Sequence, residues 1–434
     1  MKAACFALIV LCFSANAYAA TKNAASCSRA DVGTAVNSAS DGDTIVIPAG
    51  TCTWTSNLTI TGKILVLQGA GMNNTVIVDG VSKETYPNIP QVLTYFTKPG
   101  GMTRITGMTF TGGTIPDNYN KGMIEIGGNS DQFRMDNVRI RPTTTSGVFF
   151  TGNVRGVLDH SVFELNTWHF GIYVFHEKWN NIGDFGDASY ADDSHLGTNK
   201  AIFIEDNVFD SNDKSIAIDG WSGSRVVFRH NTLRNVGFAN HGTETGGRWR
   251  SQRVFEVYDN TISYDTFQWA NMVGLRGGTG VIFNNRGTYT GSGFTQVVAE
   301  LTNYRYSDRS RLYSPWGFCD GSNIWDGNQQ SSGYPCLDQP GRGKGTLLSG
   351  FDPAPAGWTS QVSDPVYAWG NTLNGQPSPL KSSAAVVAEG RDYFNAPKPN
   401  YTPYTYPHPL TQGASGSSSA PSGPSAPTNV RIVS

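Results

Sequence analysis

The sequence has few charged residues and no cluster of one sign. Charged residues make up 15% of the 434 residues, and 32 basic side chains stand against 34 acidic ones. There is no basic tail and no run of lysine and arginine, which a nucleic-acid-binding surface would need. After residue 20 there is also no apolar run long enough to span a bilayer. We therefore expect neither a nucleic-acid partner nor a membrane span.

Cysteine is scarce, and two of the six cysteines fall within the first 20 residues. Residues 1–20 have the pattern of a secretory signal peptide, with Lys2 at the start, an apolar stretch over 7–13 and a small-residue cleavage site at 17–19. The mature protein would then be secreted, either extracellular or periplasmic. The four remaining cysteines are an even number in an oxidising compartment. We expect the pairs Cys27–Cys52 and Cys319–Cys336, while the other two connectivities stay open.

Short segments repeat along the chain, each marked by a polar residue two places beyond an apolar strand. The markers are Asn137, Ser161, Asn207, Asn231, Asn260 and Asn285. A repeat of about two dozen residues that alternates apolar and polar residues is typical of a solenoid of stacked strands. We therefore predict an all-β fold, a right-handed parallel β-helix, with a capping helix near Asp31 to Ala39 over its open end. The aligned asparagines predict an internal ladder of side-chain amides.

One β-helix domain is expected over residues 21–410. Insertions near 177–199 and 243–252 interrupt its repeat, and irregular coils follow from 305 to 410. Residues 411–434 read as a flexible linker with a terminal stub, because 413–427 contain only Gly, Ser, Ala and Pro. Inserted loops of repeat proteins tend to gather on one face, often the binding face.

A second repeated strand follows each marker, and alternation predicts which of its residues point outward. The predicted outward column reads Gly127, Thr151, Phe175, Asp219, His241, Arg276 and Glu300. Its second half is polar, and neighbours on successive coils would lie about 5 Å apart. A surface ladder of opposite charges, worth under about 1 kcal/mol per pair, is the alternative to a functional site.

The polar half of this column suits β-elimination on a uronic acid. His241 could take the proton next to the carboxyl group, with Asp219 orienting the imidazole. Arg276 could neutralise the carboxylate. Hydrolysis would instead need two carboxylates, and the predicted separation of Asp219 and Glu300, about 15 Å, exceeds the roughly 5–10 Å that glycosidases use.

Further contacts to the polysaccharide are expected from the column and the insertions that flank it. The candidate substrate-binding residues are Trp221, Arg248, Arg250, His176, Lys178 and Glu300. Four carboxylates in the first insertion could bind Ca²⁺, the one cofactor that the sequence suggests, although a solvated acidic loop is the alternative. They are Asp184, Asp187, Asp192 and Asp193.

Residues 42–51, GDTIVIPAGT, follow the predicted capping helix, and this opening resembles that of the pectate-lyase-like family of right-handed parallel β-helix proteins. The resemblance implies an extracellular protein whose groove takes a polysaccharide, often an acidic one and sometimes with Ca²⁺. His241-Gly242 is similar to part of the Arg-His-Gly stretch of the chondroitinase-B and alginate-lyase branch, with Asn240 where the Arg would stand. The Arg-x-Pro-x-x-Arg element of the pectate lyases is absent.

These observations favour a secreted polysaccharide lyase that acts on an acidic, uronic-acid-containing polysaccharide. One alternative is a non-catalytic extracellular protein that binds glycans or serves as a surface component. A glycoside hydrolase or an epimerase on the same fold is the other, because fold alone does not determine the reaction.

Overall fold

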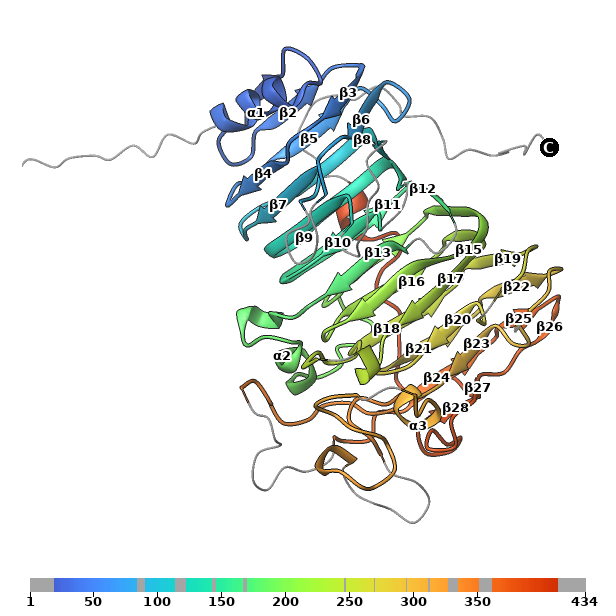
Figure 1. The fold of residues 1–434 in the computed structure, drawn as a ribbon. Helices are drawn as coiled ribbons and strands as arrows, with labels where there is room; N and C mark the ends of the chain where they lie inside the picture. The colour runs from blue at the N-terminus through green and yellow to red at the C-terminus, as the bar shows by residue number, and fades with distance from the viewer. Residues whose placement is uncertain are drawn as a thin grey trace, which may run out of the picture.

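The computed structural model describes residues 19–83, 90–113, 122–142, 146–166, 170–245, 247–268, 270–293, 295–310, 313–326, 335–350 and 361–412. Nearly all of the predicted signal peptide and of the predicted linker and stub lies outside these residues. The described chain is rich in strands and has few helices, so the predicted all-β class is confirmed (Figure 1).

The strands stack coil upon coil (Figure 1) and form one continuous network, because several long strands run round a corner. The pairings between successive coils divide this network into three sheets. The first sheet contains β4 (Leu58–Thr61), β7 (Leu93–Thr97), the start of β9 (Ile124–Arg141), β10 (Val148–Phe150), β13 (Phe170–Phe175), the ends of β15 (Val208–Trp221) and β17 (Thr232–Asn240), β20 (Val273–Leu275), β23 (Ala299–Leu301) and β27 (Lys381–Ser382).

The second sheet contains β1 (Thr21–Asn23), β2 (Thr44–Ile47), β5 (Val66–Gly69), the start of β8 (Thr103–Gly112), the middle of β9, β11 (Asn153–Asp159), β14 (Ile202–Glu205), β16 (Arg225–Arg229), β18 (Val254–Tyr258), β21 (Thr279–Phe283), β24 (Val366–Trp369) and β28 (Tyr393–Phe394). The third contains β3 (Gly50–Trp54), β6 (Thr75–Asp79), the ends of β8 and β9, β12 (Val162–Leu165), the starts of β15 and β17, β19 (Thr261–Tyr264), β22 (Arg286–Tyr289) and β25 (Thr372–Leu373). Every pairing between these strands is parallel, and β26 (Gln376–Pro377) adds an antiparallel hairpin to β25.

The asparagine ladder stands inside one corner of the coils. The backbone N–H and the side-chain amide of Asn207 both donate to Asn231 Oδ1, at 3.0 and 3.1 Å. In the same way, the backbone N–H and the side-chain amide of Asn231 donate to Asn260 Oδ1, at 2.9 and 3.1 Å. The ladder continues through Asn285 to Asn371. This confirms the predicted ladder from Asn207 onward.

Asn137 is the exception among the predicted markers. It has a positive φ of 50°, as do the residues just before the other markers, for example His160 at 49° and His230 at 56°. Asn137 therefore occupies the left-handed turn position rather than the ladder position. Its side-chain amide donates to Asp136 next to it, at 2.7 Å.

The open end of the first coil is covered by α1 (Arg29–Ser38), close to the predicted capping helix (Figure 1). Ser28 caps the helix by accepting a hydrogen bond from the Asp31 N–H, and Val32 and Val36 are buried against the first coil. The Cys27–Cys52 disulfide, with a Cα–Cα distance of 5.8 Å, joins the segment before α1 to β3. Cys319 and Cys336 form the second disulfide. Both predicted pairings are confirmed.

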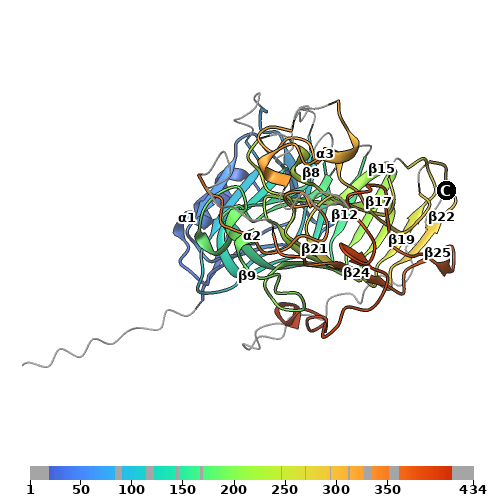
Figure 2. The same cartoon turned by 90° about the horizontal axis from the view of Figure 1, so that it is seen from below.

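Three irregular segments leave the coil at the same corner, between the first and second sheets. The first, between β13 and β14, holds η1 (Trp179–Asn181) and α2 (Asp187–Ala191). The second, between β17 and β18, holds η2 (Thr243–Thr245). The third, between β23 and β24, holds α3 (Tyr304–Ser307) and η3 (Ile324–Asp326). Figure 1 draws α2 beside the orange third segment at the lower end of the coil stack, and Figure 2 shows that segment from below.

Residues 401–412, ending in η4 (Pro409–Gln412), pack across the outer face of the second sheet. Arg229 donates to the carbonyl of Tyr404 at 2.7 Å and pairs with Glu205 at 2.6 Å, both side chains being fully buried. Within the described residues, no helix is long and apolar enough to cross a membrane.

Candidate functional site

The first sheet carries two neighbouring outward columns where the sequence predicted one. In the first column, Tyr173, Asp219, Ala239, Gly274, Glu300 and Lys381 are paired in register on successive strands. In the second, Phe175 pairs with Trp221, and His241 and Arg276 directly follow the ends of β17 and β20. The prediction joined the two columns because it aligned Ile218 with Val174, whereas Ile218 pairs with Ile172. Register shifts between β15 and β17 then place Ala239, rather than His241, beside Asp219.

Asp219 and His241 nevertheless meet, because the imidazole leans back by one coil onto the carboxylate. His241 Nδ1 lies 2.6 Å from Asp219 Oδ1. The Asp219 side chain is fully buried, while that of His241 is 17% exposed. Because a carboxylate is an acceptor, Nδ1 carries the proton of this hydrogen bond and Nε2 is left as the acceptor of a neutral imidazole.

Burial lowers the pKa of His241 below 6.5, and the nearby positive charge of Arg276 lowers it further. Asp219 and Glu244 oppose this shift in the pKa of the imidazole. The pair therefore combines a neutral imidazole at neutral pH with a buried carboxylate that fixes its tautomer. This is an arrangement for proton abstraction.

Arg276 is held in place by several contacts. Its backbone N–H donates to Asn240 Oδ1 and its Nε donates to the Asn240 carbonyl, both at 2.6 Å. Its Nη1 lies 2.8 Å from Glu244 Oε1, and its guanidinium lies 5.1 Å from the centre of the Tyr304 ring. Arg276 is therefore a preorganised cation next to His241.

A cavity of about 370 Å³ opens over the first sheet beside Arg276, which lines it, whereas Asp219 and His241 are not among its lining residues. Ala239 and Gly274 form its floor, and Arg276, Tyr304 and Glu300 line it. Two small residues in adjacent register positions create the hollow, because a Cβ added at Gly274 would meet nothing within 4 Å. The volume lies within the range typical of small-ligand pockets.

Aromatic rings continue the second column on the other side of His241. The Trp221 ring lies 4.1 Å from the His241 ring and stacks on Phe175 at 5.3 Å. Trp249, from the second irregular segment, lies 6.0 Å from Phe175. Such ring faces suit the apolar faces of sugars.

The other predicted substrate-binding residues lie in different surroundings. His176 is fully buried, with its pKa lowered to about 3 by burial, and its ring nitrogens bond the carbonyl of Val154 and the backbone N–H of Arg225. Arg250 is 1% exposed, as its ion pairs with Asp187 and Asp338 require. These two residues offer no surface to a polysaccharide, and we leave them out of the site.

Arg248 and Lys178 are not part of the cavity. Arg248 pairs with Asp187 at 2.8 Å and donates to the carbonyl of Leu348, while Lys178 is exposed on the first irregular segment. Glu300, in contrast, lines the cavity and accepts a hydrogen bond from Asn271 Nδ2 at 2.5 Å.

The four suggested calcium ligands do not converge. Asp187 is fully buried between two arginines, Asp192 accepts hydrogen bonds from Trp179 and His195, and Asp193 pairs with Lys344. Asp184 is exposed. No three of these carboxylates, all of which are described, lie within reach of one ion.

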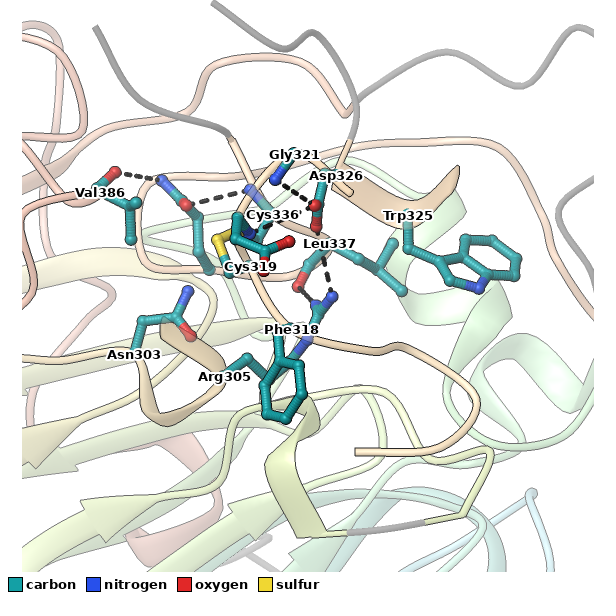
Figure 3. The surroundings of a disulfide bond; sticks show 12 residues. Asn303, Arg305, Phe318, Cys319, Gly321, Trp325, Asp326, Cys336, Leu337 and Val386 are labelled. Atoms are coloured by element: carbon teal, nitrogen blue, oxygen red, sulfur yellow. Dashed lines mark hydrogen bonds and ion pairs between the residues drawn. A yellow bond between two sulfur atoms is a disulfide. The ribbon is translucent and has the colours of Figure 1, made fainter. Parts of the chain in front are cut away.

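Within the described part of the chain, the one cluster with metal-ligand spacing is Cys319, Asp326 and Cys336. Figure 3 shows why it is structural: the two sulfur atoms form a disulfide, and Asp326 accepts from the backbone N–H of Gly321 and pairs with Arg305 at 3.6 Å.

Sequence reasoning did not find several residues of the cavity. Tyr304, Asn271 and Lys381 come from irregular segments or short strands that lack the repeat. Glu244 lies in the second irregular segment, whose proximity to Arg276 has no sequence signal. Gly274 could have been found, because it is the glycine between two inward residues in the repeated strand.

No protein-family model matches the sequence, and no curated protein matches it. Several solved structures resemble the fold, including the three that follow. An alginate lyase from Paenibacillus sp. str. FPU-7 is 12% identical, with a TM-score of 0.40, covering 87% of this chain and 99% of that one. ORF18 of Geobacillus virus E2 is 15% identical, with a TM-score of 0.35 and coverage of 63% and 52%. The catalytic domain of a GH87 alpha-1,3-glucanase is 12% identical, with a TM-score of 0.34 and coverage of 89% and 68%. Likeness at this level carries no argument about activity.

Proposed function

We propose that this protein is a secreted polysaccharide lyase that cleaves a uronic-acid-containing polysaccharide by β-elimination. One observation carries the proposal: His241 lies 2.6 Å from the buried carboxylate of Asp219, with Arg276 on the next strand and a cavity beside it. We also propose that the three-sheet coil is right-handed and of the pectate-lyase-like type. The predicted signal peptide and two disulfides support secretion.

The reaction would proceed with the uronate carboxylate on Arg276. The guanidinium neutralises the carboxylate and so acidifies the C–H next to it. His241 Nε2 takes that proton, while Asp219 stabilises the imidazolium that forms. The electron pair of the C–H bond becomes a carbon–carbon double bond, and the bond to the glycosidic oxygen breaks. Tyr304, which lines the cavity, is the phenol that we assign as proton donor to the leaving oxygen.

Trp221 would hold a neighbouring sugar ring by stacking next to the base. The four carboxylates suggested for Ca²⁺ do not converge, so we assign the neutralisation of the substrate carboxylate to Arg276. Hydrolysis has weaker support, because Asp219 and Glu300 stand three strand spacings apart in one column, about 15 Å. Glycosidase carboxylates lie roughly 5–10 Å apart.

The test follows the near-ultraviolet absorbance of unsaturated sugar ends while purified protein is incubated with a panel of uronic-acid polysaccharides. We expect the wild type to produce this absorbance, and His241→Ala and Asp219→Asn to lower kcat by roughly a hundredfold or more, since general-base catalysis supplies that much. Lys178→Gln, an exposed change outside the cavity, is the control.

Epimerisation would change the sugar without an absorbance change, hydrolysis would give reducing ends alone, and a binding protein would give neither. A wild type without unsaturated product would therefore contradict the lyase proposal.

A further inference from the structure

The segment that follows His241 is bound to the third irregular segment by a buried hydrogen bond. Thr243, two residues after His241, is 3% exposed, and its Oγ1 accepts a hydrogen bond from Arg305 Nη1 at 3.2 Å. Arg305 belongs to α3, which follows β23, two coils beyond the strand that leads to His241. A residue distant in sequence therefore contacts the segment that carries the proposed base.

Arg305 is itself rigidly held. It is 1% exposed, its Nε donates to the carbonyl of Gly317 at 2.8 Å and its Nη2 donates to the carbonyl of Trp316 at 2.6 Å. Nη1 also donates to the carbonyl of Leu337 at 3.3 Å, and Nη2 lies 3.6 Å from Asp326 Oδ1. A planar guanidinium that is bonded through all three nitrogens has one orientation.

The Cys319–Cys336 disulfide closes the third segment around this guanidinium (Figure 3). The backbone N–H of Cys319 donates to the Arg305 carbonyl at 3.0 Å. Leu337, whose carbonyl accepts from Arg305, directly follows Cys336. The third segment is therefore cross-linked at the place where it binds Arg305.

The surroundings of Arg276 depend on the same helix. Tyr304 directly precedes Arg305, and its ring centre lies 5.1 Å from the Arg276 guanidinium. Glu244 directly follows Thr243 and lies 2.8 Å from Arg276 Nη1. Burial lowers the pKa of Arg305 to about 10, and Glu244 is one of the carboxylates that oppose this lowering. The carboxylate of Glu244 therefore lies near both arginines.

Gly242 allows this close arrangement. A Cβ at Gly242 would lie 2.3 Å from Glu244 Oε2 and 2.8 Å from the Arg276 carbonyl oxygen. The residue between His241 and Thr243 therefore has to be glycine for Glu244 to reach Arg276.

We propose that Arg305 is a positioning residue of the site, which fixes residues 241–244 through Thr243 and carries Tyr304 beside Arg276. Groups that act on one substrate have to keep a common geometry, and a misplacement of about 1 Å can lower the rate a hundredfold. The inference rests on the proposed function, because it takes His241, Arg276 and Tyr304 as the groups that act on the substrate.

The test removes the hydroxyl of Thr243 and then restores it. Thr243→Val has nearly the same shape without the hydroxyl, Thr243→Ser keeps the hydroxyl, and Arg305→Lys keeps the charge without the planar fork. Thr34→Val, at an exposed position in α1, is the matched control. We expect Thr243→Val and Arg305→Lys to lower kcat by roughly tenfold or more with KM nearly unchanged, and the other two variants to behave as wild type.

A second readout does not depend on activity. NMR follows the Nδ1 proton of His241, which forms the hydrogen bond to Asp219. We expect this proton to exchange with water roughly tenfold faster in Thr243→Val than in the wild type, because loss of a hydrogen bond to a charged group lets the segment open more often. Thr243→Ser should keep the wild-type exchange rate.

The outcomes separate this inference from the proposed function. If the wild type forms unsaturated product and Thr243→Val keeps either its kcat or its exchange rate, Arg305 does not position the site, while the lyase proposal stands. Equal losses in Thr243→Ser and Thr243→Val would overturn the inference as well, because the hydroxyl would then not matter. If the wild type forms no unsaturated product, the exchange rate decides: faster exchange in Thr243→Val alone supports the positioning role, and equal rates overturn it.

Discussion

At the scale of single residues, the site depends on how the surroundings of His241 set its protonation. Burial is the largest cause of its lowered pKa, and the charge of Arg276 is the next. A base is active when neutral, so a lowered pKa extends activity toward lower pH, and the acid limb of kcat/KM is expected below pH 6.5.

Arg276→Gln should therefore raise the pKa of His241, because one of the two causes of its lowering is removed. Glu244→Gln removes a negative charge that raises this pKa, and it should move the pKa in the opposite direction. The measurement is an NMR titration of the imidazole protons, which does not depend on activity. Shifts of the same sign in the two variants would contradict this electrostatic account.

The residues of the site were predicted more successfully than their geometry. Asp219, His241 and Arg276 do come together, but from two columns, because sequence alternation cannot reveal the register shifts within β15. Glu244 and Tyr304 escaped prediction because they come from segments without a repeat. His176 and Arg250 were assigned to the surface because their burial depends on contacts between distant segments.

At the scale of elements, the asparagine ladder holds the coils in register. Asn231 accepts two hydrogen bonds from Asn207 through Oδ1 and donates through Nδ2 to the carbonyls of Ile204 and Arg229. These groups are buried, so the backbone N–H of Asn207 and the carbonyls of Ile204 and Arg229 would lose these hydrogen bonds if the amide were removed.

Asn231→Ala should lower the free energy of unfolding by about 3 kcal/mol, since each unpaired buried group costs about 1–3 kcal/mol. Urea denaturation followed by circular dichroism measures the loss. Asn73→Ala, at an exposed position, should cost less than about 0.5 kcal/mol. An equal cost at both positions would mean that the ladder does not stabilise the coils.

This ladder and the capping helix could be predicted because both follow from a local pattern repeated along the chain. The one error in the ladder is Asn137, which was placed one residue out of step with the other repeats. Asn137 corresponds to the left-handed turn residue that precedes each ladder position, and Asn284 shows that this turn residue can also be asparagine. Residue type alone does not separate the two positions.

At the scale of the whole molecule, a buried triad joins the three irregular segments. Arg250 of the second segment pairs with Asp187 of the first at 2.9 Å and with Asp338 of the third at 2.7 Å, and all three side chains are fully buried. The triad thereby holds the second irregular segment, which carries Trp249 and Glu244, in place beside the site.

Arg250→Met should cost about 3–5 kcal/mol, because it leaves the buried carboxylate of Asp338 without its cation and leaves Asp187 with Arg248 alone. The same variant should become sensitive to proteolysis between residues 187 and 252 before the coil itself is cut. Thermal unfolding and limited proteolysis test this, with Arg309→Met, whose partner Asp320 is on the surface, as the control. Unaltered stability and protection would show that the segments dock without the triad.

The most direct test of the account is the absorbance assay on polyuronate with the wild type and His241→Ala side by side. We predict that unsaturated ends accumulate with the wild type and are lost in His241→Ala, while the variant retains the folded circular dichroism spectrum and still binds an oligouronate. Unsaturated product formed equally well by His241→Ala would contradict the assignment of the base, and none from the wild type on any uronic-acid polymer would contradict the proposed reaction.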